Sequence, residues 1–115
     1  MSKDCLFCKI IKGDIPSEKV FENDNVLGFK DIFPQAKEHY LFIHKRHSTN
    51  INEMTSQSTD QLSDIFRSIS KFTKESNLVD EGFRVVTNSG LFGGQTVFHT
   101  HFHILGGEQL KGFGA

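Results

Sequence analysis

The 115-residue chain carries 13 basic and 14 acidic side chains, a formal net charge of −1, and 37% hydrophobic residues. This near-neutral balance gives no reason to expect a nucleic-acid-binding surface or an anionic-membrane surface. The length suits one hydrophobic core, and no repeat, linker or low-complexity tract interrupts it, so we expect one domain over residues 1–115.

The N-terminal segment MSKDCLFCKIIKGD carries charges where a secretory signal has an uninterrupted apolar stretch, and no later run approaches membrane-spanning length. We therefore predict a cytoplasmic protein. Residues 5–12 predict a short helix, which Gly13 and Pro16 end. The only cysteines, Cys5 and Cys8, form one C-x-x-C pair there. This spacing is too short for a loop-closing disulfide and favours a metal or redox pair in a reducing compartment.

Three strands are expected next. The segments EKVFEN (18–23) and VLGFKD (26–31) predict a β-hairpin, because the Asn-Asp-Asn sequence at 23–25 suits a tight turn. The segment HYLFIHK (39–45) is apolar enough to be a central strand.

Residues 58–76 predict the one long amphipathic helix, since apolar residues recur there at helical spacing and Ser58 or Thr59 can cap its start. Two more strands, at 82–89 and 98–105, are joined by the glycine-rich segment GLFGGQ. This order of elements indicates an α+β fold, in which the long helix covers one side of a five-stranded, mostly antiparallel sheet.

The last expected strand contains three histidines, His99, His101 and His103, at every second position. Alternate residues of a strand share a face, so we expect these imidazoles to point the same way, while Thr100, Phe102 and Ile104 take the opposite face. Three imidazoles on one face can bind a metal, attack a substrate, or simply meet solvent. The strict alternation, with further histidines at 39, 44 and 47, favours a functional site.

Nucleophilic catalysis is the most specific of these possibilities. A neutral imidazole held in one tautomer can attack phosphorus, and neighbouring histidines can protonate the leaving group and hold the phosphoryl oxygens. The preceding segment NSGLFGGQT (88–96) adds glycines that let backbone N–H groups approach an anion. A glycine-rich loop alone is weak evidence, but its position directly before the histidines favours a phosphate site.

The segment QTVFHTHFHILGG resembles the signature of the histidine triad (HIT) family, with Thr100 at the first apolar position. The resemblance extends to CLFCKIIKGDIPSEKVFENDNVLGFKDIFPQA, HYLFIHKRH and GFRVVTNSG, which match the Hint branch in order and spacing. It implies the HIT-like fold, with one long helix and a short N-terminal helix, and a nucleotidyl-histidine intermediate.

The resemblance also implies residue roles. His101, the middle triad histidine, is the expected nucleophile, and His103 is expected to hold the α-phosphate. His39 corresponds to a supporting histidine that orders and protonates the triad. Asp31 matches the carboxylate that accepts both ribose hydroxyls, a role that suits a two-oxygen acceptor.

Other nucleotide-binding positions are implied in the same way. An apolar purine slot is expected from Phe7, Ile10, Phe29, Ile32 and Leu41, although composition alone makes each of them an ordinary core residue. The phosphate loop is expected to use Asn88, Gly94, Gln95 and Thr96, with threonine in place of the usual serine.

Two departures from the family pattern stand out. His44 occupies a position where many relatives have proline, and we expect it to be an exposed histidine at the end of a strand. The C-terminal EQLKGFGA lacks the tryptophan-containing ending through which some relatives contact the leaving group of the partner subunit.

A structural zinc ion needs four ligands, and the sequence has no second C-x-x-C. Bacterial relatives that keep the cysteine pair imply His47 and His99 as the other two ligands. The alternatives are that both cysteines only pack on the first helix, or that they form a redox pair. If His99 binds zinc, it cannot serve as a freely titrating catalytic residue, and catalysis depends on His101, His103, His39 and Thr96.

The resemblance to the Hint branch implies a hydrolase or transferase that cleaves the P–N bond of purine nucleoside 5′-phosphoramidates, such as adenylated lysine, and releases AMP or GMP. We expect a homodimer and no organic cofactor. The alternatives are a dinucleoside polyphosphate hydrolase, a galactose-1-phosphate uridylyltransferase, a hydrolase with a catalytic zinc, and a non-catalytic nucleotide-binding module that contains zinc.

Overall fold

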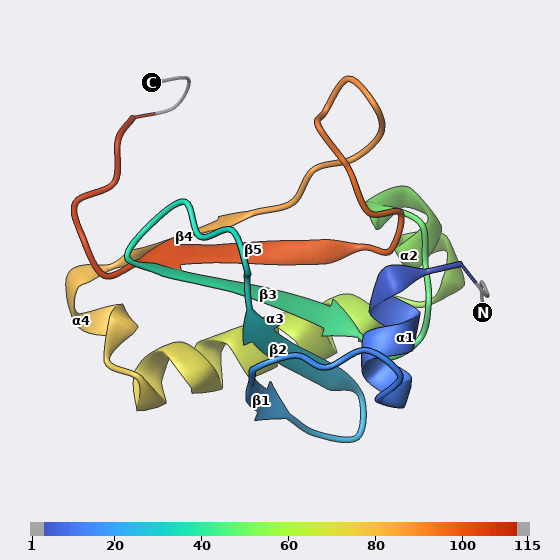
Figure 1. Cartoon of the computed structure of the whole chain (residues 1–115), viewed down its shortest axis with the longest axis horizontal. Coiled ribbons are helices and arrows are strands. Elements are labelled where there is room, and N and C mark those ends of the chain that lie inside the picture. The colour runs from blue at the N-terminus through green and yellow to red at the C-terminus, as the bar shows by residue number, and fades with distance from the viewer. Residues whose placement is uncertain (1–3, 113–115) are drawn as a thin grey trace.

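The structure, a computed structural model, describes residues 4–112 and confirms the α+β fold (Figure 1). Five antiparallel strands form one sheet in the order β1-β2-β3-β5-β4. The elements in chain order are α1 (Leu6–Lys12), β1 (Lys19–Glu22), β2 (Val26–Lys30), β3 (Glu38–His44), α2 (Ile51–Gln57), α3 (Asp60–Glu75), α4 (Leu78–Glu81), β4 (Phe83–Val86) and β5 (His101–Gly106).

The N-terminal helix begins and ends where the sequence predicts. Cys5 caps α1, its sulfur accepting the backbone N–H of Cys8, and Gly13 ends the helix in the left-handed conformation with φ of 88°. The buried residues Phe7 and Ile10 face the sheet. This helix therefore places both cysteines against the sheet, near the start of β5 (Figure 1).

The β1–β2 hairpin depends on Asn23, whose side-chain oxygen accepts the backbone N–H groups of Asn25 and Val26. Beyond the hairpin, β2 pairs with β3, and Gly28 lies opposite Phe42. A Cβ at position 28 would lie 2.7 Å from the Phe42 ring, so this aromatic residue fills the space that the glycine leaves. The central strand β3 is buried along nearly its whole length, as its composition predicts.

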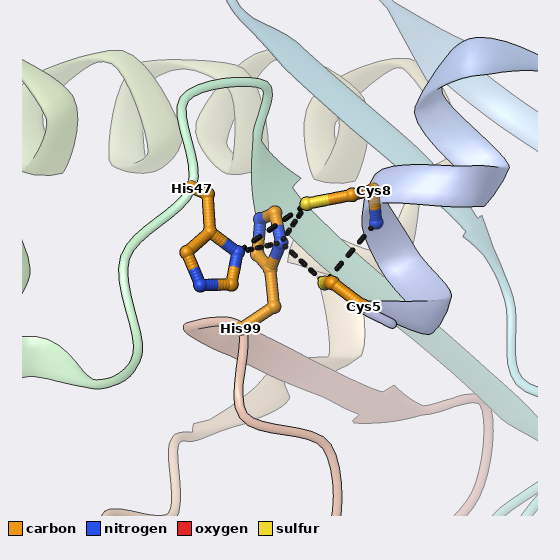
Figure 2. Close-up of side chains that lie close together, drawn as sticks. All are labelled: Cys5, Cys8, His47 and His99. Atoms are coloured by element: carbon orange, nitrogen blue, oxygen red, sulfur yellow. Dashed lines mark hydrogen bonds between the residues drawn. The ribbon is translucent and has the colours of Figure 1, made fainter. Parts of the chain in front are cut away.

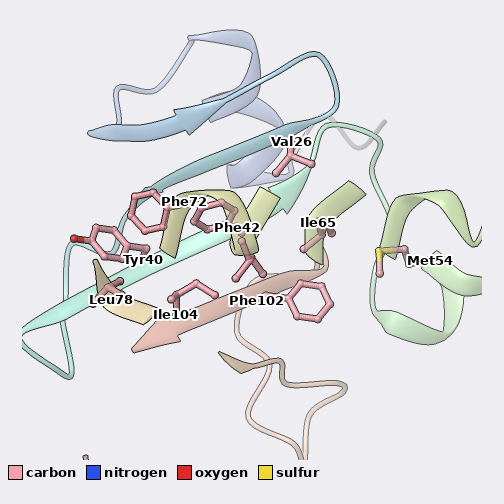
Figure 3. Close-up of a cluster of buried hydrophobic side chains, with 10 residues drawn as sticks. Val26, Tyr40, Phe42, Met54, Ile65, Phe72, Leu78, Phe102 and Ile104 are labelled. Carbon is pink, nitrogen blue, oxygen red and sulfur yellow. The ribbon is translucent and has the colours of Figure 1, made fainter. Parts of the chain in front are cut away.

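The long helix α3 covers one face of the sheet and forms the main core (Figure 3). Ile65, Ile69 and Phe72 pack from the helix against alternate residues of the central strands. The N-cap residue Thr59 makes no side-chain cap hydrogen bond, but the hydroxyl of the preceding Ser58 accepts the backbone N–H of Asp60. The ten buried residues of this cluster are Val26, Tyr40, Phe42, Met54, Ile65, Ile69, Phe72, Leu78, Phe102 and Ile104.

Several features differ from the sequence-based expectation, among them the end of β4, which is at Val86 rather than at residue 89. The short helices α2 and α4 were not predicted, because neither is long enough to show helical periodicity. A local signal for α2 exists, since Asn50 caps it by accepting the backbone N–H of Glu53. The last strand begins at His101 rather than at residue 98, because the backbone N–H of Thr100 donates to the Ser48 carbonyl instead of to a neighbouring strand.

Candidate active site and metal centre

The face of the sheet opposite α3 carries the histidines. In the β3–β5 pairing, Leu41 lies opposite His103 and Ile43 lies opposite His101. The edges of the His99 and His101 rings meet the ring of Phe7 from α1, with centroids 6.0 and 5.1 Å apart. Phe102 and Ile104 instead join the α3 core. The expected division of the two faces is therefore confirmed, although His99 lies just before the strand.

The tautomer of His101 follows from its hydrogen bond. Its Nδ1 lies 2.7 Å from the backbone carbonyl of His99. A carbonyl oxygen only accepts, so Nδ1 carries the proton and Nε2 keeps its lone pair. Burial lowers the pKa of His101, which favours this neutral form at pH 7. The site thus holds an imidazole with one fixed, unprotonated nitrogen.

The pair His39 and His103 is ordered in the complementary way. The backbone N–H of Gln35 donates to His39 Nδ1 at 3.0 Å, so the proton of His39 is on Nε2. That nitrogen donates to Nδ1 of His103 at 2.9 Å. His103 therefore carries its own proton on Nε2. Next to it lies the ring of His101, with centroids 5.1 Å apart. His101 thus offers a lone pair, and His103 offers an N–H donor.

Burial is also the main influence on the charges of this pair. It lowers the pKa of His39, an effect that the negative charge of Asp31 partly offsets. It lowers the pKa of His103 to about 4, with further lowering from the neighbouring histidines. Both side chains are consequently neutral near pH 7, as the hydrogen-bond pattern requires.

Asp31 follows β2 and lies beside this pair. One of its oxygens, Oδ1, accepts the backbone N–H of Phe33 at 2.8 Å, which fixes the carboxylate in a turn. The other, Oδ2, lies 3.4 Å from Nε2 of His39. The side chain of Asp31 is 16% exposed, so an entering ligand can still reach it. The structure thus places the expected ribose-binding carboxylate in contact with the histidine pair.

A second cluster brings Cys5, Cys8, His47 and His99 together from three different places in the chain (Figure 2). Nδ1 of His99 lies 3.3 Å from Sγ of Cys5, 3.5 Å from Sγ of Cys8 and 3.2 Å from Nδ1 of His47. Nδ1 of His47 also lies 3.3 Å from Sγ of Cys8. All four candidate ligand atoms lie within 4.8 Å of one another.

These distances fit a tetrahedral metal ion. An ion about 2.3 Å from sulfur and about 2.1 Å from nitrogen separates its ligands by roughly 3.3–3.8 Å. His99 is oriented for this role, because its Nε2 donates to the His44 carbonyl at 3.0 Å and leaves a lone pair on Nδ1. Burial lowers the pKa of His99 to about 4, so this lone pair is not lost to protonation. The cluster is therefore compatible with a metal site.

The Cys8 thiol is disfavoured from ionising in this environment. Burial and the adjacent Cys5 raise the pKa of Cys8 to about 11. A bound metal ion would reverse that preference, since it stabilises the thiolate directly. The group Asp31, His39 and His103 is also close enough to bind an ion, but there Nε2 of His39 carries a proton and forms a hydrogen bond. That second group is better described as a hydrogen-bonded relay.

The residues of the expected purine slot do not all lie together. Phe7, Ile10, Phe29 and Leu41 belong to the buried cluster between α1 and the sheet. Ile32, in contrast, is 82% exposed on the loop after β2. Ile32 is therefore not a core residue, and it does not pack with the other four residues of the expected slot. The loop carries it away from the sheet because β2 ends at Lys30.

The glycine-rich loop is built around Gln95. Its side-chain oxygen accepts the backbone N–H of Gly90, and its side-chain nitrogen donates to the carbonyls of Thr49 and Val97. The amide is thus used to shape the loop. Gly94 has a left-handed φ of 83°, and the position of its missing Cβ is 3.9 Å from Nδ2 of Asn88. These two predicted positions do lie side by side.

Thr96 follows this loop and is exposed. It lines a cavity of about 520 Å³ together with Cys5, His47 and Thr49. Thr96 therefore lies on the side of the molecule where Cys5 and His47, two of the four candidate metal ligands, are placed.

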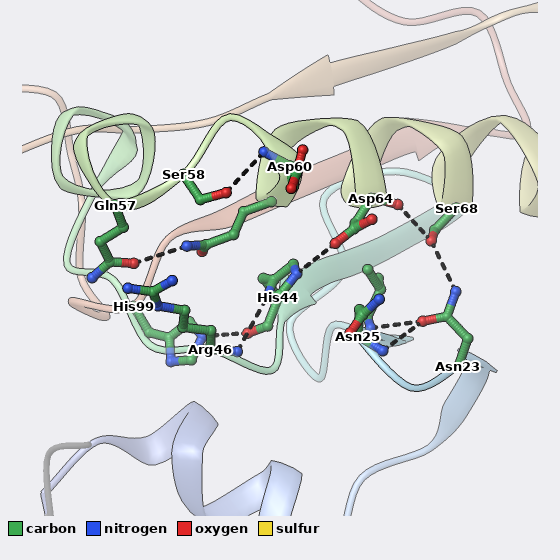
Figure 4. Close-up of polar contacts among 12 residues, drawn as sticks. Asn23, Asn25, His44, Arg46, Gln57, Ser58, Asp60, Asp64, Ser68 and His99 are labelled. Atoms are coloured by element: carbon green, nitrogen blue, oxygen red, sulfur yellow. Dashed lines mark hydrogen bonds and ion pairs between the residues drawn. The ribbon is translucent and has the colours of Figure 1, made fainter.

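The expectation for His44 is wrong. It is 9% exposed, and its Nε2 lies 3.0 Å from Oδ2 of Asp64 on α3 (Figure 4). The backbone N–H of Arg46 donates to its Nδ1 at 3.1 Å, so Nε2 carries the proton and donates to the carboxylate. Strand alternation could have revealed this contact, because His44 shares a face with Tyr40 and Phe42, which pack against the helix.

The comparisons with known proteins agree with this geometry. A family model described as "Scavenger mRNA decapping enzyme C-term binding" matches residues 4–113. A HIT-like protein from Synechococcus elongatus is 41% identical over 110 residues, which cover 96% of each chain. The crystal structure of a histidine triad protein from Clostridium difficile superposes with a TM-score of 0.94 at 42% identity and covers 98% of each chain. The chain belongs to the histidine triad family.

Two further HIT relatives carry functional names. A purine nucleoside phosphoramidase from Escherichia coli K12 is 34% identical over 110 residues, which cover 96% of this chain and 92% of the relative. A HIT family hydrolase from Clostridium thermocellum superposes with a TM-score of 0.93 at 37% identity, with both chains fully covered. Within residues 4–112, this HIT protein has no helix that is long and apolar enough to cross a membrane.

Sequence reasoning missed several groups that orient these histidines. Three of them are the backbone N–H of Gln35, the backbone carbonyl of His44, and the carboxylate of Asp64. The first two are main-chain groups, which every residue type supplies, so no motif reveals them. Asp64 had a signal, since it lies on the helix that was expected to cover the sheet.

Proposed function

We propose that this HIT protein hydrolyses the P–N bond of purine nucleoside 5′-phosphoramidates through a nucleotidyl-His101 intermediate. The observation that carries the proposal is the pair of fixed tautomers, in which Nε2 of His101 has a lone pair and Nε2 of the adjacent His103 has a proton. The name of the 34% identical phosphoramidase supports the choice of substrate class.

The covalent step uses the lone pair of His101. Nε2 attacks the α-phosphorus, a bond forms between phosphorus and this nitrogen, and the bond to the amine breaks. The positive charge on the imidazole is partly neutralised by the hydrogen bond from Nδ1 to the His99 carbonyl. The departing amine takes up a proton, and the water that later cleaves the adduct gives one back. The net reaction is hydrolysis, and His101 is restored.

The other residues bind and orient the nucleotide. The N–H of His103 donates to a phosphoryl oxygen and stabilises the charge that develops there. We assign the base to a slot beside Phe7, Ile10, Phe29 and Leu41, whose edge the exposed Ile32 can cover. The phosphoryl group meets the glycine-rich loop at Asn88, Gly94, Gln95 and Thr96, where Gln95 acts by holding the loop in shape.

We also propose that the ion held by Cys5, Cys8, His47 and His99 is zinc and that its role is structural. Two thiolates and two imidazoles are a ligand set that suits zinc, and four protein ligands leave no open position for a substrate. The ion would tie α1, which carries Phe7, to the start of β5. It takes no part in the covalent step.

A homodimer completes the proposal. Strand β4 lies at an edge of the sheet, so one side of its backbone is unpaired. Beside it, Phe66, Val79 and Val85 are 49%, 46% and 39% exposed around an apolar cavity of about 260 Å³. A second copy related by twofold symmetry would pair this edge and cover these side chains.

The decisive experiment traps the intermediate. Rapid quenching of the protein with labelled adenosine phosphoramidate should yield an acid-labile nucleotide adduct, and His101→Ala should form none while it still binds AMP. His103→Ala should keep the adduct but react roughly 10²–10³ times more slowly, because it loses one donor. An adduct on the His101→Ala protein would refute the nucleophile assignment.

A substrate panel tests the alternatives. AMP released faster from diadenosine polyphosphates than from phosphoramidates would indicate a dinucleoside polyphosphate hydrolase. Binding of AMP without turnover of any substrate would indicate a non-catalytic module. Complete loss of turnover on mild chelation, while the fold persists, would indicate a catalytic metal.

A further inference from the structure

The contact between Asp31 and His39 is not needed for binding ribose, so it points to a second role for this carboxylate. Nε2–H of His39 donates to Nδ1 of His103 at 2.9 Å, and Oδ2 of Asp31 lies 3.4 Å from the same nitrogen. The side chain of His39 is 2% exposed, so the carboxylate faces the imidazole in a nearly dry space. In such surroundings a carboxylate acts strongly on a neighbouring imidazole.

The carboxylate is held in this position by the backbone. Because the N–H of Phe33 fixes Oδ1, rotation of the side chain away from His39 would break a hydrogen bond of 2.8 Å. The same loop also fixes the imidazole, since the N–H of Gln35 holds Nδ1 of His39. At its far end, the backbone N–H of Lys37 donates to Glu108. One loop, residues 31–37, thus sets both the carboxylate and the ring that it faces.

We infer that Asp31 is a positioning residue for the His39–His103 pair, in addition to binding ribose, and that the ribose hydroxyls change this second role. This inference rests on the proposed function. In the free protein Asp31 competes with His103 for the proton of His39. When two hydroxyls donate to the carboxylate, its acceptor strength falls and the proton of His39 goes fully to His103. Filling the nucleoside site therefore completes the ordering of the group that holds the phosphate.

The electrostatic effects on the histidines support the same coupling. The charge of Asp31 acts to raise the pKa of His39, His101 and His103, against the larger lowering caused by burial. Within the described part of the chain, Asp31 is the carboxylate that acts on all three of these histidines. A change in the charge of Asp31 thus alters the pKa of all three of these histidines.

A substrate without ribose hydroxyls separates the two roles. We would measure kcat and KM of the wild type and of Asp31→Asn with adenosine phosphoramidate and with its 2′,3′-dideoxy analogue. Asparagine can still accept the N–H of Phe33, so the turn is kept. On the dideoxy substrate there is no ribose contact to lose, and Asp31→Asn removes the carboxylate that competes for the proton of His39, so it should raise kcat by roughly tenfold. Asp24→Asn, which removes one charge in the exposed β1–β2 turn, should leave both values unchanged.

The outcomes are distinct. An unchanged kcat of Asp31→Asn on the dideoxy substrate would show that Asp31 only binds ribose, and it would overturn the inference while the proposed function stands. Absence of turnover by the wild type on both substrates would instead refute the proposed function.

A spectroscopic test works without turnover. In protein labelled with ¹⁵N at histidine, AMP should shift the Nε2 signal of His39 more than 2′,3′-dideoxy-AMP does, and Asp31→Asn should abolish that difference. Equal shifts with both nucleotides in the wild type would contradict the coupling, whether or not the protein is an enzyme.

Discussion

The contact between His44 and Asp64 allows a quantitative prediction about stability. The imidazole of His44 is buried, and the side chain of Asp64 is 32% exposed. Nε2 of His44 lies 3.0 Å from Oδ2 of Asp64. Asp64→Ala removes a hydrogen bond to a charged acceptor and leaves a buried N–H without a partner. Such a loss costs about 1.5–3 kcal/mol of unfolding free energy.

This cost should be visible in both thermal and urea unfolding. For a chain of this size it corresponds to a decrease in Tm of about 5–15 °C. Asp64→Asn should cost less, because its amide oxygen can still accept the N–H of His44. Glu75→Ala removes an exposed charge at the end of the same helix and should change the stability by no more than about 0.5 kcal/mol.

A double-mutant cycle decides whether the contact itself is responsible. The variant with both His44→Ala and Asp64→Ala should be less destabilised than the sum of the single variants by about 1 kcal/mol or more, because the second change removes a group that is already unpaired. Additivity within about 0.5 kcal/mol would refute the reasoning, since it would mean that the two side chains do not stabilise each other.

Three other predictions follow from the metal cluster, the buried histidines and the sheet edge. Elemental analysis should find about one zinc per chain, and replacing Cys5 and Cys8 with serine should lower Tm more than it lowers turnover; metal-free protein purified without chelators would contradict this. NMR titration should give His103 a pKa of about 4. Since its pKa in the unfolded chain is about 6.5, His103 binds its proton more readily when unfolded, and stability should fall as pH decreases from 6.5 toward 4; a normal pKa would show that the ring is solvated. Val85→Lys on the edge strand should convert the proposed homodimer into a monomer in light scattering, and a dimer mass that persists would place the interface elsewhere.

Much of the fold could be predicted because its signals are local. Apolar spacing in residues 58–76 indicated α3, and Asn23 with its neighbours indicated the hairpin. The limits were also local: α2 and α4 are shorter than the periodicity needed to recognise a helix. The start of β5 was misplaced because Thr100 bonds to Ser48, a residue of a distant loop.

The candidate site was also predictable only in part. The resemblance to HIT proteins indicated which histidines and cysteines would gather, and the structure brings Cys5, Cys8, His47 and His99 to hydrogen-bonding distances. The burial of His44 was missed because its position was considered without its face of the strand. The exposure of Ile32 was missed because a loop conformation has no repeating pattern in sequence.

The main-chain groups that orient the imidazoles have an evolutionary consequence. A substitution at position 35, 44, 46 or 99 changes a side chain but still supplies a carbonyl, and it supplies an N–H unless the new residue is proline. Most substitutions at these positions thus leave the proton positions of the imidazole rings unchanged. At position 44 even proline keeps the carbonyl that holds His99. Positions 35 and 46, which must donate an N–H, are therefore the places where a diverging lineage would be expected to tolerate many residues and to avoid proline alone.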